Sequence, residues 1–329
     1  MAADDMMVRI DALVGGGRHA EAARLLMAAA AGGDPAALSQ LGFWRVAGSI
    51  VRRDLAKARA LFAEAAAKGD SGAALIHASF LANGTGGEAQ WPEALAALRR
   101  LAGKVPQAAA QLRLIETMDL DEDGFPARPI PVRPLAASPH AVAAEGFLTR
   151  AECAYLIRAA ETGFQPSVVV DPATGRMVPH PGRICDAAMF GVFAEDLAVN
   201  AINRRIAALS GTAPAQGESL QVLRYRPGGQ YKPHMDGLPA EPNQRILTVL
   251  VYLSDDYEGG ETRFERTGLA FRGKAGDALL FRNANAEGRP DPMSLHAGLP
   301  VAKGVKYLAS RWIRARAFTF PPPRPLLDL

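Results

Sequence analysis

The stretch Gly229-Gln230-Tyr231-Lys232-Pro233-His234-Met235-Asp236 carries the sharpest pattern in the chain. Side chains two residues apart point to the same side of an extended backbone, so His234 and Asp236 project together. An isolated pair of this kind is weak evidence for a metal site, because a third ligand must come from elsewhere in the chain. His296, 60 residues beyond Asp236 and within a predicted strand, is the best candidate for that ligand.

These three residue types point to one kind of metal chemistry. Two imidazoles and one carboxylate on one face of an octahedron leave three positions free, an arrangement that suits non-haem Fe(II) oxygenases. A hydrolase based on Ser294, close to His296, is disfavoured because no nucleophile elbow surrounds that serine.

Short runs of β-forming residues, separated by Gly, Pro or Asp, surround this stretch. They cover residues 220–226, 246–253, 261–265, 269–272, 278–282, 294–301 and 306–315. We also expect an entry strand over 141–147, a helix over 149–161 with Thr149 as its N-cap, and a second helix near 194–209. Seven short strands favour a β-sandwich or barrel. We choose a double-stranded β-helix (jelly roll), although the spacing alone is compatible with another sandwich.

Lys306 opens the last of these runs. Period-two alternation places Lys306, Leu308, Ser310 and Trp312 on one face of the strand. If that face lies inside the barrel, Lys306 is a buried cation, which is costly without a counter-charge. A dicarboxylate cosubstrate would supply one.

Residues 220–316 resemble the collagen-type prolyl 4-hydroxylases among the 2-oxoglutarate oxygenases. The resemblance rests on the opening stretch together with Arg224-Tyr225, TVLVYL at 248–253, GGETRF at 259–264, GDALLF at 276–281, SLHAG at 294–298, GVK at 304–306 and Trp312. It extends to about 170 residues if the Glu145-Gly146-Phe147-Leu148 segment is the family's usual entry.

The resemblance implies a set of roles. His234, Asp236 and His296 would bind Fe(II), and Lys306 would hold the distal carboxylate of 2-oxoglutarate. The hydroxyls of Tyr225 and Thr262 would help to hold that cosubstrate.

The substrate side would be lined by Arg183, Tyr231 and Trp312, although Arg183 is followed by Ile184-Cys185, where the family usually has Thr or Ser after the Arg. Each of these side chains could instead be structural, Arg183 in a surface ion pair and the two aromatics in the core.

The implied reaction consumes Fe(II)-bound O2 and 2-oxoglutarate, releases succinate and CO2, and hydroxylates a carbon of the substrate, with ascorbate allowed as an auxiliary reductant. A prolyl residue of a peptide or protein is the expected substrate. The alternatives are hydroxylation of a free amino acid or other small molecule, oxidative demethylation of nucleic acid, and a non-catalytic interaction protein.

The first third of the chain is helical and repetitive. Residues 29–34 (AAAGGD) align with 65–70 (AAAKGD) at an offset of 36, and a weaker third copy follows. Repeats of this length indicate stacked helix pairs that bury their apolar faces together. The pattern resembles tetratricopeptide-like repeats of the Sel-one type. Such an α-solenoid would either dock a peptide or protein substrate or only stabilise its neighbour.

A cluster of prolines separates the two halves. We expect an α+β multidomain chain: helical repeats over 1–118, a Pro-rich linker over 119–140, the oxygenase domain over 141–318 and an extended Pro-rich tail over 319–329.

Composition narrows the partners. Subtracting the number of Asp and Glu from the number of Lys and Arg gives a formal net charge of 15 − 15 = 0 for residues 1–140 and 22 − 19 = +3 for residues 141–329. A nucleic-acid binder usually has a strongly basic face, so no such partner is expected. No apolar run reaches the length of a membrane span, and the first 14 residues lack the apolar core of a signal peptide. We expect a cytoplasmic protein with no membrane partner; its oligomeric state stays open.

Overall fold

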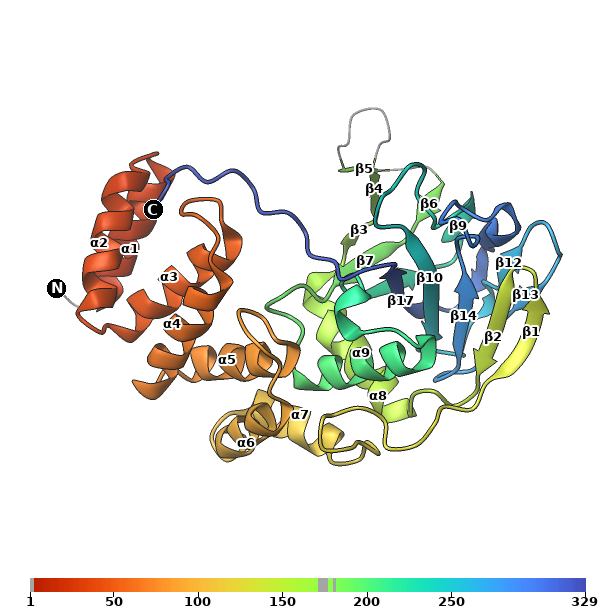
Figure 1. Ribbon diagram of the computed structural model, residues 1–329, viewed down its shortest axis with the longest axis horizontal. Helices are drawn as coiled ribbons and strands as arrows, with labels where there is room; N and C mark the ends of the chain where they lie inside the picture. Colours follow the sequence, from red (N-terminus) through yellow and green to blue (C-terminus); the bar gives the residue numbers. More distant parts are fainter. Residues whose placement is uncertain (1–2, 171–176, 180–181) are drawn as a thin grey trace. The chain divides into compact units, whose positions relative to one another are not determined.

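The computed structural model describes residues 3–170, 177–179 and 182–329 (Figure 1). The chain forms two compact units. The first comprises Met1–Gly124, Glu195–Ala201 and Phe320–Leu329, and the second comprises Phe125–Ala194 and Ile202–Thr319. Among the described residues, no helix is both long enough and apolar enough to cross a membrane.

The first unit is built from consecutive helices, each packed on the next along the chain. They are α1 (Ala3–Gly15), α2 (His19–Ala31), α3 (Pro35–Ala47), α4 (Leu55–Ala67), α5 (Ser71–Asn83), α6 (Trp91–Ala102) and α7 (Pro106–Ile115). The predicted N-terminal helical region is confirmed.

Local sequence explains where the repeated helices begin. Asp34 caps α3 by accepting a hydrogen bond from the Ala37 N–H, and Asp70, 36 residues later, caps α5 through the Ala73 N–H. Each of these helices ends at a glycine in the left-handed conformation, Gly48 or Gly84. The 36-residue offset in the sequence is therefore an offset between equivalent helix ends.

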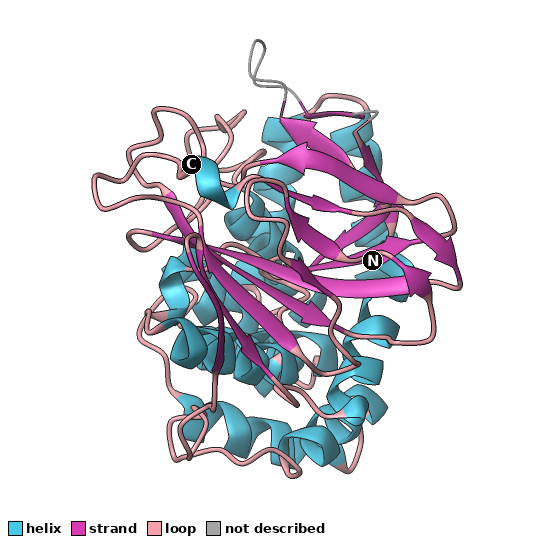
Figure 2. Ribbon diagram, turned by 90° about the vertical axis from the view of Figure 1, so that its right-hand side faces the viewer, coloured by secondary structure: helices cyan, strands magenta, loops and turns pink. Residues whose placement is uncertain are grey.

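Two principal antiparallel sheets form the second unit (Figure 2). The larger has the order β1-β2-β14-β10-β17-β8-β7-β3, and the smaller has the order β13-β12-β15-β9-β6. Chain neighbours often lie in different sheets, as in a jelly roll. The strands of the larger sheet are β1 (Arg133–Ala137), β2 (His140–Ala144), β3 (Gln165–Pro166), β7 (Asp186–Met189), β8 (Gln221–Tyr225), β10 (Arg245–Tyr252), β14 (Ala278–Arg282) and β17 (Lys306–Arg314).

The smaller sheet contains β6 (Arg183–Ile184), β9 (Gln230–His234), β12 (Thr262–Phe264), β13 (Ala270–Phe271) and β15 (His296–Gly298). Two further pairs are β4 (Val168–Val170) with β5 (Met177–Pro179), and β11 (Glu258–Gly259) with β16 (Val301–Lys303). The helices of this half of the chain are α8 (Arg150–Ala160) and α9 (Leu197–Ser210).

An apolar core fills the space between the two sheets. Phe264 from the smaller sheet meets Phe281 from the larger sheet edge-on, with ring centroids 5.1 Å apart. Leu223, Leu250 and Leu308 pack in the same cluster. The predicted double-stranded β-helix is confirmed, and Thr149 caps α8 through a capping box with Glu152.

Two segments differ from the sequence-based expectation. Residues 119–140 were expected to form a linker, yet β1 lies within them and pairs with β2 at the edge of the larger sheet. An edge strand tolerates Pro134 because the strand has a partner on one side only, so the N–H that proline lacks is not needed for pairing on the other side. The expected tail is not a separate segment either, because Phe320–Leu329 groups with the helical unit.

Candidate active site

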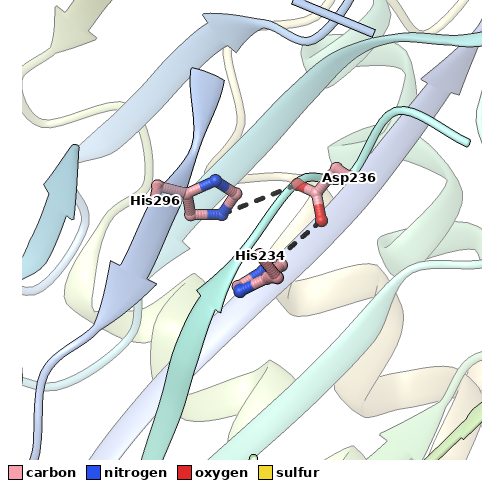
Figure 3. A group of neighbouring side chains, drawn as sticks. All are labelled: His234, Asp236 and His296. Atoms are coloured by element: carbon pink, nitrogen blue, oxygen red, sulfur yellow. Dashed lines mark ion pairs between the residues drawn. The ribbon is translucent and has the colours of Figure 1, made fainter. Parts of the chain in front are cut away.

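Strand pairing brings His234, Asp236 and His296 together (Figure 3). His234 ends β9 and lies opposite His296, the first residue of β15. Asp236 Oδ1 lies 3.6 Å from His234 Nε2, and Asp236 Oδ2 lies 3.8 Å from His296 Nε2. The three possible ligand atoms all lie within 4.8 Å of one another.

Main-chain carbonyls fix which nitrogen of each imidazole is available. His234 Nδ1 lies 2.8 Å from Lys232 O, and His296 Nδ1 lies 2.9 Å from Ser294 O. A carbonyl can only accept, so each Nδ1 carries the proton and each Nε2 presents a lone pair toward Asp236. Two imidazole lone pairs and a carboxylate form a donor set that fits a divalent transition metal.

The protonation states favour metal binding at neutral pH. Burial lowers the pKa of His234 to about 3, and the neighbouring His296 adds to this effect. Burial opposes ionisation of Asp236, but the two imidazoles and a hydrogen bond from Thr248 outweigh it and keep the pKa of this carboxyl below its usual value. Few protons therefore compete with a metal for these atoms.

A buried hydrogen-bond chain orients the carboxylate. Thr248 Oγ1 on β10 donates to Asp236 Oδ2 at 2.6 Å, and Asn283 Nδ2 donates to Thr248 Oγ1 at 2.7 Å. Both Thr248 and Asn283 are fully buried. Sequence reasoning missed these two residues. The only signal for Thr248 was a hydroxyl within an otherwise apolar strand.

The nine residues singled out from the sequence all line one pocket. Its lining comprises Arg183, Leu223, Tyr225, Tyr231, His234, Asp236, Leu250, Thr262, His296, Gly298, Lys306, Leu308, Ser310 and Trp312. The remaining five, which the sequence did not single out as site residues, are three Leu, one Gly and Ser310.

Lys306 is a buried cation of this pocket, as is Arg183. Only 2% of the Lys306 surface is exposed. Nζ donates to Gly260 O at 2.7 Å and lies 5.4 Å and 5.2 Å from the ring centroids of Tyr225 and Tyr252. Burial lowers its pKa to about 7, which Glu261 opposes only in part. Within the described ranges, no carboxylate forms a salt bridge with Lys306.

Hydroxyl groups lie near the same end of the pocket. Tyr225 pairs with Lys306 across β8 and β17. Thr262 Oγ1 lies 2.8 Å from the Tyr252 hydroxyl, and that hydroxyl donates to Phe271 O at 3.0 Å. Because the Phe271 carbonyl takes the Tyr252 proton, Thr262 donates to Tyr252. Tyr252 is thus a supporting residue that the sequence reasoning did not single out.

Two residues of the pocket lining carry hydrogen-bond donors without partners. Among the described residues, buried Arg183 Nε and Trp312 Nε1 have no hydrogen-bond acceptor. The Arg183 guanidinium lies 5.2 Å from the centroid of the Tyr231 ring, which stacks on His234 at 3.4 Å. Arg245 covers the Trp312 ring at 3.7 Å. A bound molecule with carbonyl groups could satisfy the two donors.

We predict that Thr248→Val weakens divalent metal binding about ten- to hundredfold, since a lost outer hydrogen bond frees the ligand to rotate. Isothermal titration with Fe(II) or Mn(II) measures this affinity, and a thermal melt checks the fold. Thr248→Ser keeps the hydroxyl and serves as the matched control, with affinity near wild type. Wild-type affinity in the valine variant would contradict the orienting role.

Comparison with known proteins agrees with this geometry. The family described as "2OG-Fe(II) oxygenase superfamily" matches residues 220–314. Prolyl 4-hydroxylase 1 of Arabidopsis thaliana is 37% identical over 200 residues, covering 55% of this chain and 70% of the relative. Prolyl 4-hydroxylase 5 of the same plant is 36% identical over 231 residues, covering 63% and 78%.

A solved structure is also similar. It is the viral collagen prolyl hydroxylase of Paramecium Bursaria Chlorella virus-1 in its 2OG complex, with 30% sequence identity, coverage of 54% of this chain and 96% of that chain, and a TM-score of 0.44. The curated plant relatives establish the family by their identity and coverage. The chain belongs to the prolyl 4-hydroxylase family within the 2OG-Fe(II) oxygenase superfamily.

Proposed function

We propose that this chain hydroxylates prolyl residues of a peptide or protein, using Fe(II), 2-oxoglutarate and O2. One oxygen atom of O2 enters the substrate C–H bond and the other enters succinate, with CO2 released from 2-oxoglutarate. The observation that carries the proposal is one pocket that joins a two-His, one-Asp donor set to the buried cation Lys306.

The metal assignment rests on the donor set. His234 and His296 would each supply Nε2, and Asp236 would supply a carboxylate oxygen. Three protein ligands would leave positions on the metal free for 2-oxoglutarate and O2. When bound, iron supplies the redox chemistry that no side chain can perform. The protein keeps the ligands deprotonated and oriented.

Lys306 is suited to the distal carboxylate of 2-oxoglutarate. The Lys306 ammonium forms no salt bridge with a carboxylate in the described part of the chain, so this ligand would supply its counter-charge. Tyr225 and Thr262 line the same end of the pocket and would contribute hydroxyl contacts.

The substrate assignment rests on Arg183, Tyr231 and Trp312. Tyr231 stacks directly on the His234 ring, so an apolar ring beside Tyr231 would lie next to the metal. Arg183 and Trp312 would donate to carbonyl groups of a peptide main chain. The relatives are named prolyl 4-hydroxylases, which favours a prolyl residue over the alternative of a free amino acid.

We also propose that the helical repeats hold a protein substrate. Stacked helix pairs present extended surfaces suited to peptides. A docked substrate would be present at a high local concentration near the metal.

Asp236→Ala is expected to abolish succinate formation, because it removes the only carboxylate of the donor set while leaving the strands intact. Succinate is measured at saturating Fe(II), together with a thermal melt. Asp255→Ala removes a carboxylate outside the pocket lining and serves as the control with near wild-type turnover. Substantial succinate from the Asp236 variant would show that iron binds elsewhere.

The affinity for 2-oxoglutarate should depend on pH through Lys306. Below its pKa of about 7 the ammonium is charged before the ligand arrives. Above pH 7 the bound dicarboxylate must recruit a proton to Lys306, so Kd should rise about tenfold per pH unit until the pKa of the complex is reached. Anaerobic titration of the Fe(II)-loaded protein with 2-oxoglutarate, at pH values from 6 to 9, measures this Kd.

Lys306→Arg provides the control for this titration, because guanidinium stays charged throughout the range. Its affinity is expected to be weaker but independent of pH. A wild-type Kd that does not change between pH 7 and pH 9 would contradict the assignment.

Peptidyl proline should acquire one oxygen atom. Full-length protein, Fe(II), 2-oxoglutarate and a set of Pro-rich peptides are expected to give hydroxyproline, detected as a mass increase of about 16 Da at a proline, whereas free proline should react much more slowly. The difference reflects the main-chain carbonyl groups that Arg183 and Trp312 would bind. Turnover of free amino acids with no product from any peptide would favour the small-molecule alternative.

A further inference from the structure

The last ten residues, Phe320–Leu329, form part of the helical unit, and we call them the tail. Figure 1 shows the C mark among the first helices of the chain. The tail lies along residues 48–54, which join α3 to α4 and which we call the receptor loop. This contact lies within one compact unit of the structure.

The receptor loop pairs with the tail through main-chain atoms. The Leu326 N–H donates to Ser49 O at 2.8 Å, and the Leu327 N–H donates to Ile50 O at 2.9 Å. Val51 and Leu327 form a parallel β-bridge. Pairing of this kind reads the main chain of a peptide and places little demand on its sequence.

Two arginines extend the contact at both ends of the tail. Arg45 is 7% exposed, and its Nη1 donates to Arg52 O within the receptor loop at 3.1 Å and to Leu329 O at 2.6 Å. Arg53 Nη1 donates to Phe320 O at 2.8 Å. These four hydrogen bonds between the tail and its receptor all use main-chain atoms of the tail.

The composition of the tail suits this form of recognition. Pro321, Pro322, Pro323 and Pro325 have no N–H, so the stretch between Phe320 and Leu326 leaves few donors unsatisfied. Proline also holds the chain extended before it binds, which lowers the entropic cost of ordering. An extended proline-rich peptide is therefore the ligand class that this surface fits.

The tail is held loosely. Leu326 and Leu329 are 60% and 52% exposed, so these two side chains contribute little burial, while Leu327 at the bridge is half-buried. A few main-chain hydrogen bonds support only weak binding in water. Covalent attachment sustains the contact by raising the local concentration of the tail, and a separate peptide can replace it.

The next repeat contains the corresponding loop, residues 84–90, between α5 and α6. In the receptor loop the Asp54 N–H donates to Arg45 O at 2.9 Å. At positions 36 residues later, the Gln90 N–H donates to Leu81 O at 2.7 Å. The two loops share this closing hydrogen bond and can be compared at their ends, whereas their middles differ: Gly86 has a φ of 77°, and Ile50, 36 residues earlier, does not have a positive φ.

The comparison shows that the receptor loop is specialised. Leu81 occupies the position equivalent to Arg45, and Ala89 occupies the position equivalent to Arg53. Arg59 instead donates to a main-chain carbonyl of the second loop at 2.9 Å. The hydrogen bond that closes the loop does not require an arginine at these positions, since it also forms in the second loop.

We propose that the receptor loop, with Arg45 and Arg53, holds an extended proline-rich segment of the protein substrate, and that the tail occupies this site in cis when substrate is absent. The inference rests on the proposed prolyl hydroxylation for the identity of its ligand. It gives the repeats a defined docking site and makes the tail a competitor of substrate.

The test is direct binding of a fluorescein-labelled peptide with the sequence of the tail to the full-length protein, without iron or 2-oxoglutarate. Leu326→Pro combined with Leu327→Pro removes both N–H donors and releases the tail without shortening the chain. The labelled peptide should bind this double variant about tenfold more tightly than wild type, because a tether gives an effective concentration on the order of millimolar.

Variants that copy the second loop test the receptor. Arg45→Leu or Arg53→Ala, introduced into the double variant, should each weaken peptide binding at least about tenfold, a loss of about 1.4 kcal/mol. Arg52→Leu is the matched control, because Arg52 is exposed and its side chain has no hydrogen-bond partner among the described residues. Thermal melts check that each variant folds. If Arg45→Leu unfolds, peptide binding by Arg53→Ala serves as the test, because Arg53 is only partly buried.

The expected ranking is tight binding by the double variant and its Arg52→Leu derivative, weaker binding by wild type, and weak binding after Arg53→Ala. Equal affinity of wild type and the double variant, or an unchanged affinity after Arg53→Ala, would overturn the inference. Because this assay needs no turnover, peptide binding without hydroxyproline formation would count against the proposed reaction and leave the docking site intact.

Discussion

The antiparallel register between β9 and β15 is the constraint on which the candidate site depends. It sets His234 opposite His296, and the chain then delivers Asp236 two residues beyond β9. A slip of one residue would turn His296 to the other face of the sheet and dismantle the donor set. Phe264 and Phe281 contact each other and both contact the His296 ring, which anchors this region to the larger sheet. The geometry of the site therefore depends on how the two sheets pack.

The larger sheet supplies the electrostatics of the pocket. β10 brings Thr248 to Asp236, and β17 brings Lys306 opposite Tyr225. Thr248 and Lys306 are almost completely buried. At such a position a hydroxyl without a partner or an ammonium without a counter-charge is costly. Thr248 meets its requirement within the protein, through Asp236 and Asn283. Lys306 meets its own only in part, which leaves a favourable place for an anionic ligand.

The alternation of side chains along strands and the spacing of motifs made much of the pocket and of the helical region predictable from the sequence. Alternation placed His234 with Asp236 and put Lys306, Ser310 and Trp312 on one pocket-facing side of β17. The helix capped by Thr149 and the 36-residue repeat followed from local chemistry, because caps and left-handed glycines leave direct marks in sequence.

Features that depend on long-range pairing were less accessible. Thr248, Asn283 and Tyr252 look like ordinary strand residues until pairing brings them to the site. The strand within residues 119–140 was hidden by prolines that an edge position tolerates. Likewise, nothing local indicated that Phe320–Leu329 would pair with a loop almost 280 positions earlier in the chain.

The central claim is that one pocket couples decarboxylation of 2-oxoglutarate to hydroxylation of a prolyl residue. Turnover under ¹⁸O2 tests it most directly. We expect one ¹⁸O atom in hydroxyproline and one in succinate, with the two products formed in equal amounts. Unlabelled hydroxyproline, or succinate that forms at the same rate with and without every peptide tested, would contradict it.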